Sequence, residues 1–171
     1  MTPAVALLDD GFTRIGEHVA SVVDGLGADD LSHRIAPDAN TIGWLVWHLL
    51  RVQDDHVADA AGTEQVWVSG GWADRFALPF DHDATGYGQS SDEVAAVRTT
   101  SELLAGYGEA VVGATRAWLR GLSDDDLDRV VDENWDPPVT LGVRLISVVG
   151  DALEHAGQAA FLRGILDRTA G

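Results

Sequence analysis

The stretch TIGWLVWHLLRVQDDHVADAAG, residues 41–62, decides the fold. At about 100° per residue, the apolar side chains of its first half cover nearly the whole circumference of a helix and surround His48. A helix that is apolar on several sides is buried on several sides. Asn40 is the expected N-cap and Gly62 the expected stop, so we predict a helix over residues 41–61 inside a helical bundle.

Three further segments have helical periodicity, with apolar side chains at three- and four-residue steps. They are residues 2–24, 90–119 and 141–167. Gly25 is expected to end the helix over residues 2–24. Ser90 and Glu93 form a capping-box pattern at the start of residues 90–119. The fold class predicted from this pattern is all-α, a four-helix bundle that occupies residues 1–171 as a single domain.

The connection over residues 63–89 is long, is rich in Gly, Asp and Trp, and has no helical period. Its aromatic side chains provide enough apolar surface for it to pack as a lid; they are Trp67, Trp72, Phe76 and Phe80. Long loops in compact domains often cover a functional opening. Two interpretations stay open: the loop is a lid, or it merely crosses the end of the bundle.

A short internal repeat relates the two halves of the chain. Gly-Leu followed by Asp-Asp-Leu occurs within residues 25–31 and again within residues 121–127. The start of the second helix, residues 41–43, resembles residues 140–142. Because the order helix, linker, helix occurs twice, we predict two helical hairpins with a pseudo-twofold relation.

The composition excludes several kinds of protein. The formal net charge is −17, from 11 basic and 28 acidic residues, and such a surface repels nucleic acids and anionic lipids. No apolar run approaches the ~20 residues of a membrane span, and the N-terminus lacks a signal peptide's basic region. We therefore expect a cytoplasmic protein with no membrane or nucleic-acid partner. The absence of cysteine excludes disulfides, thiolate metal sites and a cysteine nucleophile.

A narrow polar stripe interrupts the last helix and carries the candidate chemistry. Its members lie within about 60° of one another on the helical wheel; they are Arg144, Ser147, Asp151, His155 and Gln158. Asp151 and His155 are four residues apart, so both side chains can reach one metal ion. With His48 they would supply three ligands and leave one position open, as in catalytic sites, and zinc, nickel or ferrous iron would suit this set.

Other assignments of the same residues are open. Asp151 and His155 could simply hydrogen-bond to each other, and His48 could bond to a backbone carbonyl. His56 could contact a ligand or the substrate, as could Arg144 and Gln158 in the stripe. Asp55 shares a helix face with His48 and could orient that imidazole, although a solvated helix surface also explains Asp55 and His56.

Four segments of the chain resemble the DinB/YfiT-like superfamily. They are TIGWLVWHLLRVQDDHVADAAG, GGWADRF, DATGYGQSSDEVAAVR and GDALEHAGQAAFLRG. Within that superfamily the chain is most similar to an actinobacterial branch. That branch includes mycothiol S-transferases and the N-terminal domain of mycothiol-dependent maleylpyruvate isomerase.

The resemblance implies a four-helix bundle with a metal held by three side chains. One is a histidine of the second helix, which matches His48. The other two lie four apart in the fourth helix, commonly as His/His or Glu/His, and match Asp151 and His155. The chain departs from that pattern at Asp151, whose carboxylate is one methylene shorter than that of Glu, and this puts the identity of the metal in question.

The resemblance also implies the chemistry. Enzymes of this family use a low-molecular-weight thiol such as mycothiol, which a bound divalent metal, with zinc favoured, can hold as the nucleophilic thiolate. The isomerases carry a further C-terminal domain and this chain stops after the bundle, so we expect S-transfer to a small electrophilic substrate. A homodimer is also expected. The alternatives are a non-catalytic module that binds a metal or small ligand, and a structural domain whose polar stripe is only hydrogen-bonded.

Overall fold

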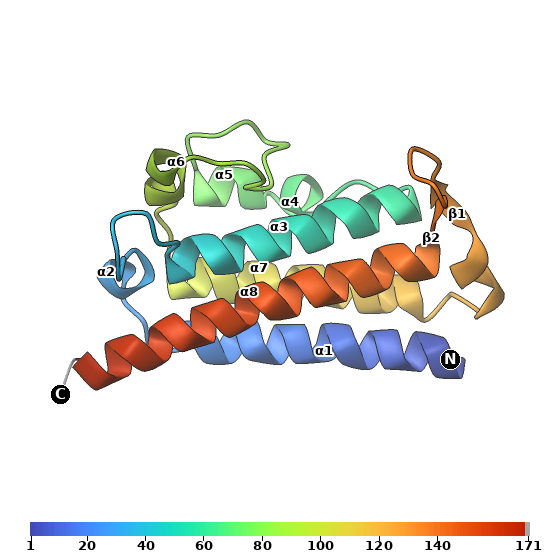
Figure 1. Cartoon of the computed structure of the whole chain (residues 1–171), viewed down its shortest axis with the longest axis horizontal. Coiled ribbons are helices and arrows are strands. Elements are labelled where there is room, and N and C mark those ends of the chain that lie inside the picture. The colour runs from blue at the N-terminus through green and yellow to red at the C-terminus, as the bar shows by residue number, and fades with distance from the viewer. Residues whose placement is uncertain (170–171) are drawn as a thin grey trace.

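In the computed structural model, which describes residues 1–169 and side chains as far as Arg168, four long helices pack into a bundle (Figure 1). They are α1 (Pro3–Val23), α3 (Ile42–Ala61), α7 (Ser101–Leu119) and α8 (Leu141–Thr169). The connections contain the short helices α2 (Ala28–Leu31), α4 (Val66–Ser69), α5 (Trp72–Phe76), α6 (Ser91–Ala96) and η1 (Asp125–Asp128), and a hairpin of β1 (Val130–Asp132) and β2 (Val139–Thr140). The predicted all-α bundle is confirmed.

The long connection between α3 and α7 is a consequence of the topology. Helices α1 and α3 each pack against both α7 and α8. Figure 1 shows that α3 and α7 run in the same direction, opposite to α1 and α8. The chain must therefore return along the bundle before α7 can begin. Residues 62–100 make this return along the side of α3, with α4, α5 and α6 on the way, and they do not merely cross the end of the bundle.

The prediction that residues 63–89 lack helical structure is wrong in part, because α4 and α5 form there. Trp67, Trp72 and Phe76 are buried. Their rings lie 5.2, 5.7 and 5.9 Å from the ring of Tyr107 on α7, between centroids. Aromatic rings at such separations attract one another and remove a large apolar area from water. The connection is therefore part of the core.

The predicted helix over residues 90–119 is broken in the structure. Ser90 and Glu93 form the expected capping box, but the helix that they open, α6, ends at Ala96. The side chain of Thr100 then accepts a hydrogen bond from the backbone N–H of Leu103 and starts α7. A threonine hydroxyl that caps a new helix competes with continuation of the old one.

The start of α3 differs from the prediction by one residue. Thr41, not Asn40, is the N-cap, and its hydroxyl accepts a 3.0 Å hydrogen bond from the backbone N–H of Trp44. Gly62 ends α3 as expected, with a left-handed φ of 67°. Among residues 1–169, no helix is both long and apolar enough to cross a membrane.

The internal repeat has a structural counterpart, although its helices do not pair as hairpins. In each half a short helix, α2 or η1, precedes a long one. A Cβ on Gly43 would lie 3.0 Å from the carbonyl oxygen of Leu31, and one on Gly142 would lie 3.3 Å from that of Leu127. The long helices of each half pack mainly against those of the other half. The two halves thus interlock, which differs from the predicted pair of hairpins.

Candidate metal centre

The packing of α3 against α8 brings the three predicted ligands together. His48 lies in the middle of α3, where apolar residues surround it, and only 6% of its surface is exposed. Asp151 and His155 lie one turn apart on α8 and are half-buried. One ligand atom from each of the three residues lies within 4.8 Å of those of the other two. Because a metal ion holds its ligand atoms closer together than this, a small inward movement of the side chains would let a single cation contact all three.

The imidazole of His48 has a defined hydrogen bond on its far side. Its Nδ1 lies 2.6 Å from the carbonyl oxygen of Thr85. A carbonyl can only accept, so Nδ1 must carry the hydrogen. Burial, the largest influence, lowers the pKa of His48, so the ring is neutral at pH 7. A neutral ring with its hydrogen on Nδ1 has a free lone pair on Nε2, the form that binds metals.

The ring of His48 also contacts two neighbouring aromatic rings. The indole of Trp44 stacks on it, with 4.6 Å between the ring centroids and 15° between the planes. The ring of His155 lies 4.8 Å away on a tilted plane. These contacts leave the imidazole little freedom to turn, so the orientation of its lone pair is set before any ligand binds.

Two polar atoms of this group are buried and have no hydrogen-bond partner among the residues that the structure describes. They are Oδ2 of Asp151 and Nδ1 of His155. An unpartnered buried carboxylate oxygen is costly, and a cation removes that cost. Two nitrogens and one carboxylate oxygen suit zinc, nickel or ferrous iron. The residues present therefore fit a divalent metal, and the alternative in which Asp151 and His155 bond only to each other is not observed in the described contacts.

A cavity of about 340 Å³ opens beside Asp151 between α3 and α8. Its lining includes His56 and Arg144. The guanidinium of Arg144 donates to Nδ1 of His56 at 3.3 Å and to the carboxylate of Asp132 at 3.1 Å. Since arginine only donates, Nδ1 of His56 must accept, and its hydrogen is on Nε2. The cavity is thus bordered by hydrogen-bond donors close to the candidate ligands.

The remaining two candidates lie apart from this group. Asp55 accepts a 2.7 Å hydrogen bond from the side chain of Gln65, whereas the partner of His48 is Thr85. The interpretation that Asp55 orients His48 therefore finds no support in the described contacts. Gln158 is exposed, because the stripe turns towards solvent one turn after His155.

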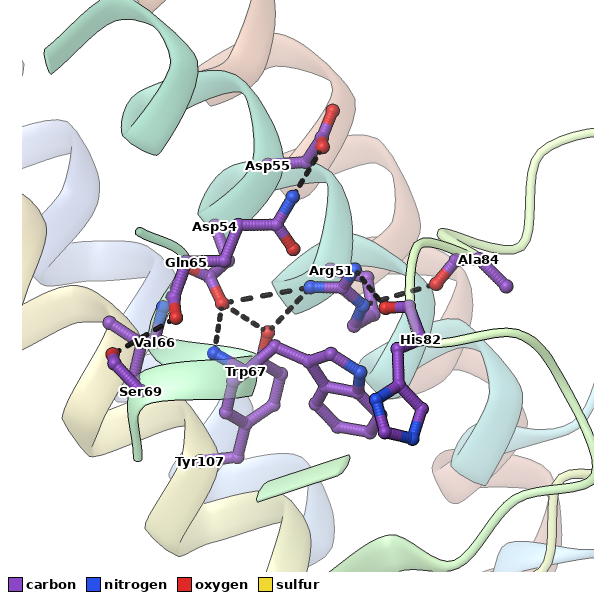
Figure 2. Close-up of polar contacts among 10 residues, drawn as sticks. All are labelled: Arg51, Asp54, Asp55, Gln65, Val66, Trp67, Ser69, His82, Ala84 and Tyr107. Carbon is purple, nitrogen blue, oxygen red and sulfur yellow. Dashed lines mark hydrogen bonds and ion pairs between the residues drawn. The ribbon is translucent and has the colours of Figure 1, made fainter. Parts of the chain in front are cut away.

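A buried polar network around Arg51 and Asp54 was not predicted from the sequence (Figure 2). Asp54 accepts hydrogen bonds from the backbone N–H groups of Val66 and Trp67 and from the hydroxyl of Tyr107. Arg51 has no exposed surface, donates to Tyr107, and lies 3.6 Å from Asp54. The sequence did contain a signal for this network. Arg51 and Asp54 lie three residues apart in a helix predicted to be buried, and buried charged side chains need partners.

Comparisons with known proteins agree with this fold. A family model described as mycothiol-S-transferase matches residues 7–168. The chain is also similar to a solved structure, a conserved protein from Enterococcus faecalis, with 29% sequence identity and a TM-score of 0.87. That similarity covers 95% of this chain and 96% of the other. No curated protein matches the chain significantly.

Proposed function

The chain belongs to the mycothiol-S-transferase family, and from this premise we propose that it is a metal-dependent transferase that adds a low-molecular-weight thiol to a small electrophilic molecule. The observation that carries the proposal is the convergence of His48, Asp151 and His155 within 4.8 Å, with a buried carboxylate oxygen that lacks a partner. Mycothiol is the thiol that the family description names.

The site supports thiol chemistry in a chain that has no sulfur nucleophile of its own. None of the 171 residues is cysteine, so the attacking sulfur must come from a co-substrate. When bound, a divalent cation lowers the pKa of a thiol and stabilises the thiolate, the nucleophilic form. His48, Asp151 and His155 would hold that cation, and burial of His48 among apolar side chains keeps its imidazole neutral and able to bind.

The electrophile would occupy the cavity beside Asp151. The cavity volume of about 340 Å³ suits a small molecule. His56 presents Nε2–H, because Arg144 donates to the opposite ring nitrogen. This N–H could hydrogen-bond an oxygen of the electrophile and support the negative charge that develops there as the C–S bond forms.

Metal analysis followed by turnover tests the proposal. The purified protein should bind close to one equivalent of Zn²⁺, Ni²⁺ or Fe²⁺, and the loaded protein should consume an alkylating electrophile only when mycothiol is present. His155→Ala should lose both properties, because one of three ligands is gone. His18→Ala is the matched control, since His18 is an exposed histidine of α1, and it should behave as the unaltered protein.

Two results would contradict the proposal. Tight metal binding without turnover of any electrophile would indicate the non-catalytic binding module. Turnover by His155→Ala at the rate of the unaltered protein would show that the three side chains are not the reactive site.

A further inference from the structure

The segment of residues 82–89, here called the clamp segment, is bound to one face of α3 around His48. Three side chains at successive turns of α3 donate hydrogen bonds to this segment: Trp44, His48 and Arg51. Nε1 of Trp44 donates to the side chain of Gln89 at 2.7 Å, and Nδ1 of His48 donates to Thr85. The face of α3 that carries the candidate ligand thus also holds the clamp segment in place.

The fit of the clamp segment at His48 is close. Gly86 follows Thr85 and has a φ of 96°, a conformation that side chains rarely permit. A Cβ on Gly86 would lie 2.7 Å from Nδ1 of His48 and 3.1 Å from the ring of Trp47. The Thr85 carbonyl can therefore reach the imidazole only if the backbone at Gly86 stays where it is.

Arg51 ties the clamp segment to α3 one turn beyond His48 (Figure 2). Its Nε donates to the carbonyl of Ala84 at 3.1 Å, and its Nη2 donates to the carbonyl of His82 at 3.4 Å. Its side chain has no exposed surface. A buried guanidinium is tolerated only when its N–H groups have hydrogen-bond acceptors. If these two carbonyls moved away, N–H groups of Arg51 would be left buried without acceptors, and this cost keeps the carbonyls in place.

The other contacts of Arg51 fix the guanidinium from the opposite side. Nη1 donates to Tyr107 and lies 3.6 Å from Asp54, and the guanidinium carbon lies 4.9 Å from the ring centroid of Trp67. A planar fork that contacts α7, α4 and the clamp segment at once cannot be replaced by the single nitrogen of lysine.

We propose that Arg51 is a positioning residue for the metal centre. It holds the carbonyls of His82 and Ala84 so that the next carbonyl, that of Thr85, keeps the hydrogen of His48 on Nδ1 and leaves the Nε2 lone pair for the cation. The inference rests on the proposed function only in taking a divalent metal as the ligand. The state of the His48 ring can be measured without any metal.

The first experiment records long-range ¹H–¹⁵N spectra of the metal-free protein at pH 8, with His48→Gln to assign the signals. The unaltered protein should show His48 as a single species with its hydrogen on Nδ1. Arg51→Met and Arg51→Lys should show both ring tautomers, because the Thr85 carbonyl is no longer held. Arg75→Met is the matched control: Arg75 also stacks on a tryptophan, 3.7 Å from the Trp72 ring centroid, but it is exposed. It should leave the His48 signals unchanged.

The second experiment measures Zn²⁺ affinity by competition with a chromophoric chelator. Loss of a group that orients a ligand typically weakens metal binding about 10- to 100-fold, and we expect a loss in this range for both Arg51 variants. Arg75→Met should bind Zn²⁺ with the affinity of the unaltered protein. If Arg51→Met fails to fold, Gly86→Ala tests the same contact, because it displaces the clamp segment at His48 and keeps the buried arginine.

The outcomes separate this inference from the proposed function. A folded Arg51→Lys protein with His48 wholly on Nδ1–H and with unchanged Zn²⁺ affinity overturns the inference. An unaltered protein whose His48 carries its hydrogen on Nε2 overturns it as well. An unaltered protein that shows the expected ring state and the expected ring response to Arg51→Lys, but binds none of Zn²⁺, Ni²⁺ and Fe²⁺, supports the positioning of His48 by Arg51 and contradicts the proposed function.

Discussion

At the residue scale, the protein itself satisfies the carboxylate of Asp151 only in part. Its Oδ2 is buried without a hydrogen-bond partner in the described part of the chain, while His48 has Thr85. A half-buried negative charge in this position favours the unfolded state unless a cation compensates it. Asp151 should therefore be a weak point of the metal-free protein and a contributor to stability once the metal is bound.

Asp151→Asn should separate these two effects. In the metal-free protein we expect an unchanged or higher Tm, because the amide carries no charge. The rise of Tm with Zn²⁺ should be largely lost; for an intact site it corresponds to about 2.7 kcal/mol at a metal concentration of 100 times Kd. Thermal unfolding with and without Zn²⁺ measures both. Glu154→Gln, the same kind of change at an exposed position on α8, is the control. A full Zn²⁺ response in Asp151→Asn would remove Asp151 from the ligand set.

Tyr107 gives a test of the buried network that needs no metal. Burial raises the pKa of Tyr107 well above its ordinary value of 10.0, and the neighbouring Asp54 adds to the effect. A raised pKa in the folded state means that Tyr107 supports stability fully below pH 10, and that this contribution falls as the pH rises above 10.

An ultraviolet titration should therefore show a late ionisation that belongs to Tyr107. This ring has no exposed surface, whereas Tyr87 is 93% exposed. Tyr107 should ionise only together with alkaline unfolding, which circular dichroism can follow in the same samples. Tyr107→Phe should lose this late ionisation. A reversible ionisation near pH 10 in the folded protein that Tyr107→Phe removes would contradict the buried position of Tyr107.

At the scale of elements, α3 and α8 were predictable because each is apolar around most of its circumference. In such a helix a polar side chain is conspicuous, so His48 and the Asp151–His155 pair could be picked out by spacing. The break between α6 and α7 was missed because the apolar period continues through it. The signal there was Thr100, a residue that caps helices well.

The partner of His48 could not be predicted in the same way. Thr85 lies 37 residues from His48 in the sequence, and its contact is made by a backbone carbonyl, which every residue has. It depends on the return path of the α3–α7 connection and on Gly86, whose positive φ is visible only in the folded chain. Arg51 and Asp54 did carry a signal, since charges inside an apolar helix must be paired.

The junction of α2 and α3 gives a prediction at this scale. Gly43 lets α3 approach the carbonyl of Leu31, and an added Cβ would lie 3.0 Å from that oxygen and 3.3 Å from Thr99. Gly43→Ala should therefore lower the free energy of unfolding by about 1 kcal/mol or more. Gly157→Ala in α8 should raise it by up to about 1 kcal/mol, because nothing lies within 4 Å and alanine favours a helix.

Urea unfolding of both variants measures whether the free energy of unfolding falls in Gly43→Ala and rises in Gly157→Ala. Circular dichroism should show the same helical content for both variants, so that a difference in stability does not come from the loss of a helix. A Gly43→Ala protein as stable as the unaltered chain would mean that α2 and α3 can move apart without cost, and that the close approach of Gly43 to Leu31 does not contribute to stability.

At the scale of the whole molecule, the site depends on which helices are neighbours. His48 and the Asp151–His155 pair meet because α3 packs on α8, and the clamp segment lies over His48 because α7 runs parallel to α3 and forces the connection to return. A simple up-and-down bundle would need no such connection. The same topology therefore assembles the ligands and supplies the carbonyl that orients one of them.

The acidity of the molecule is the last property with a measurable consequence. If all 11 basic side chains were paired, 17 of the 28 acidic ones would remain without a positive partner. Salt screens both the attractions and the repulsions, but repulsion predominates at this ratio. Raising NaCl from about 10 mM to about 0.5 M should therefore stabilise the metal-free protein by about 1 kcal/mol, which is a rise in Tm of about 2–4 °C for a chain of this length.

Thermal unfolding at matched ionic strength in NaCl and in sodium sulfate identifies the cause of that rise. Screening depends on ionic strength and should act equally in both salts, whereas exclusion from the protein surface favours sulfate. We expect the two curves to coincide up to about 0.1 M, where the Debye length of about 10 Å already spans neighbouring surface charges. A Tm that falls as NaCl is added would mean that ion pairs such as Arg116–Asp9, at 2.8 Å between α7 and α1, outweigh the repulsion among the unpaired carboxylates.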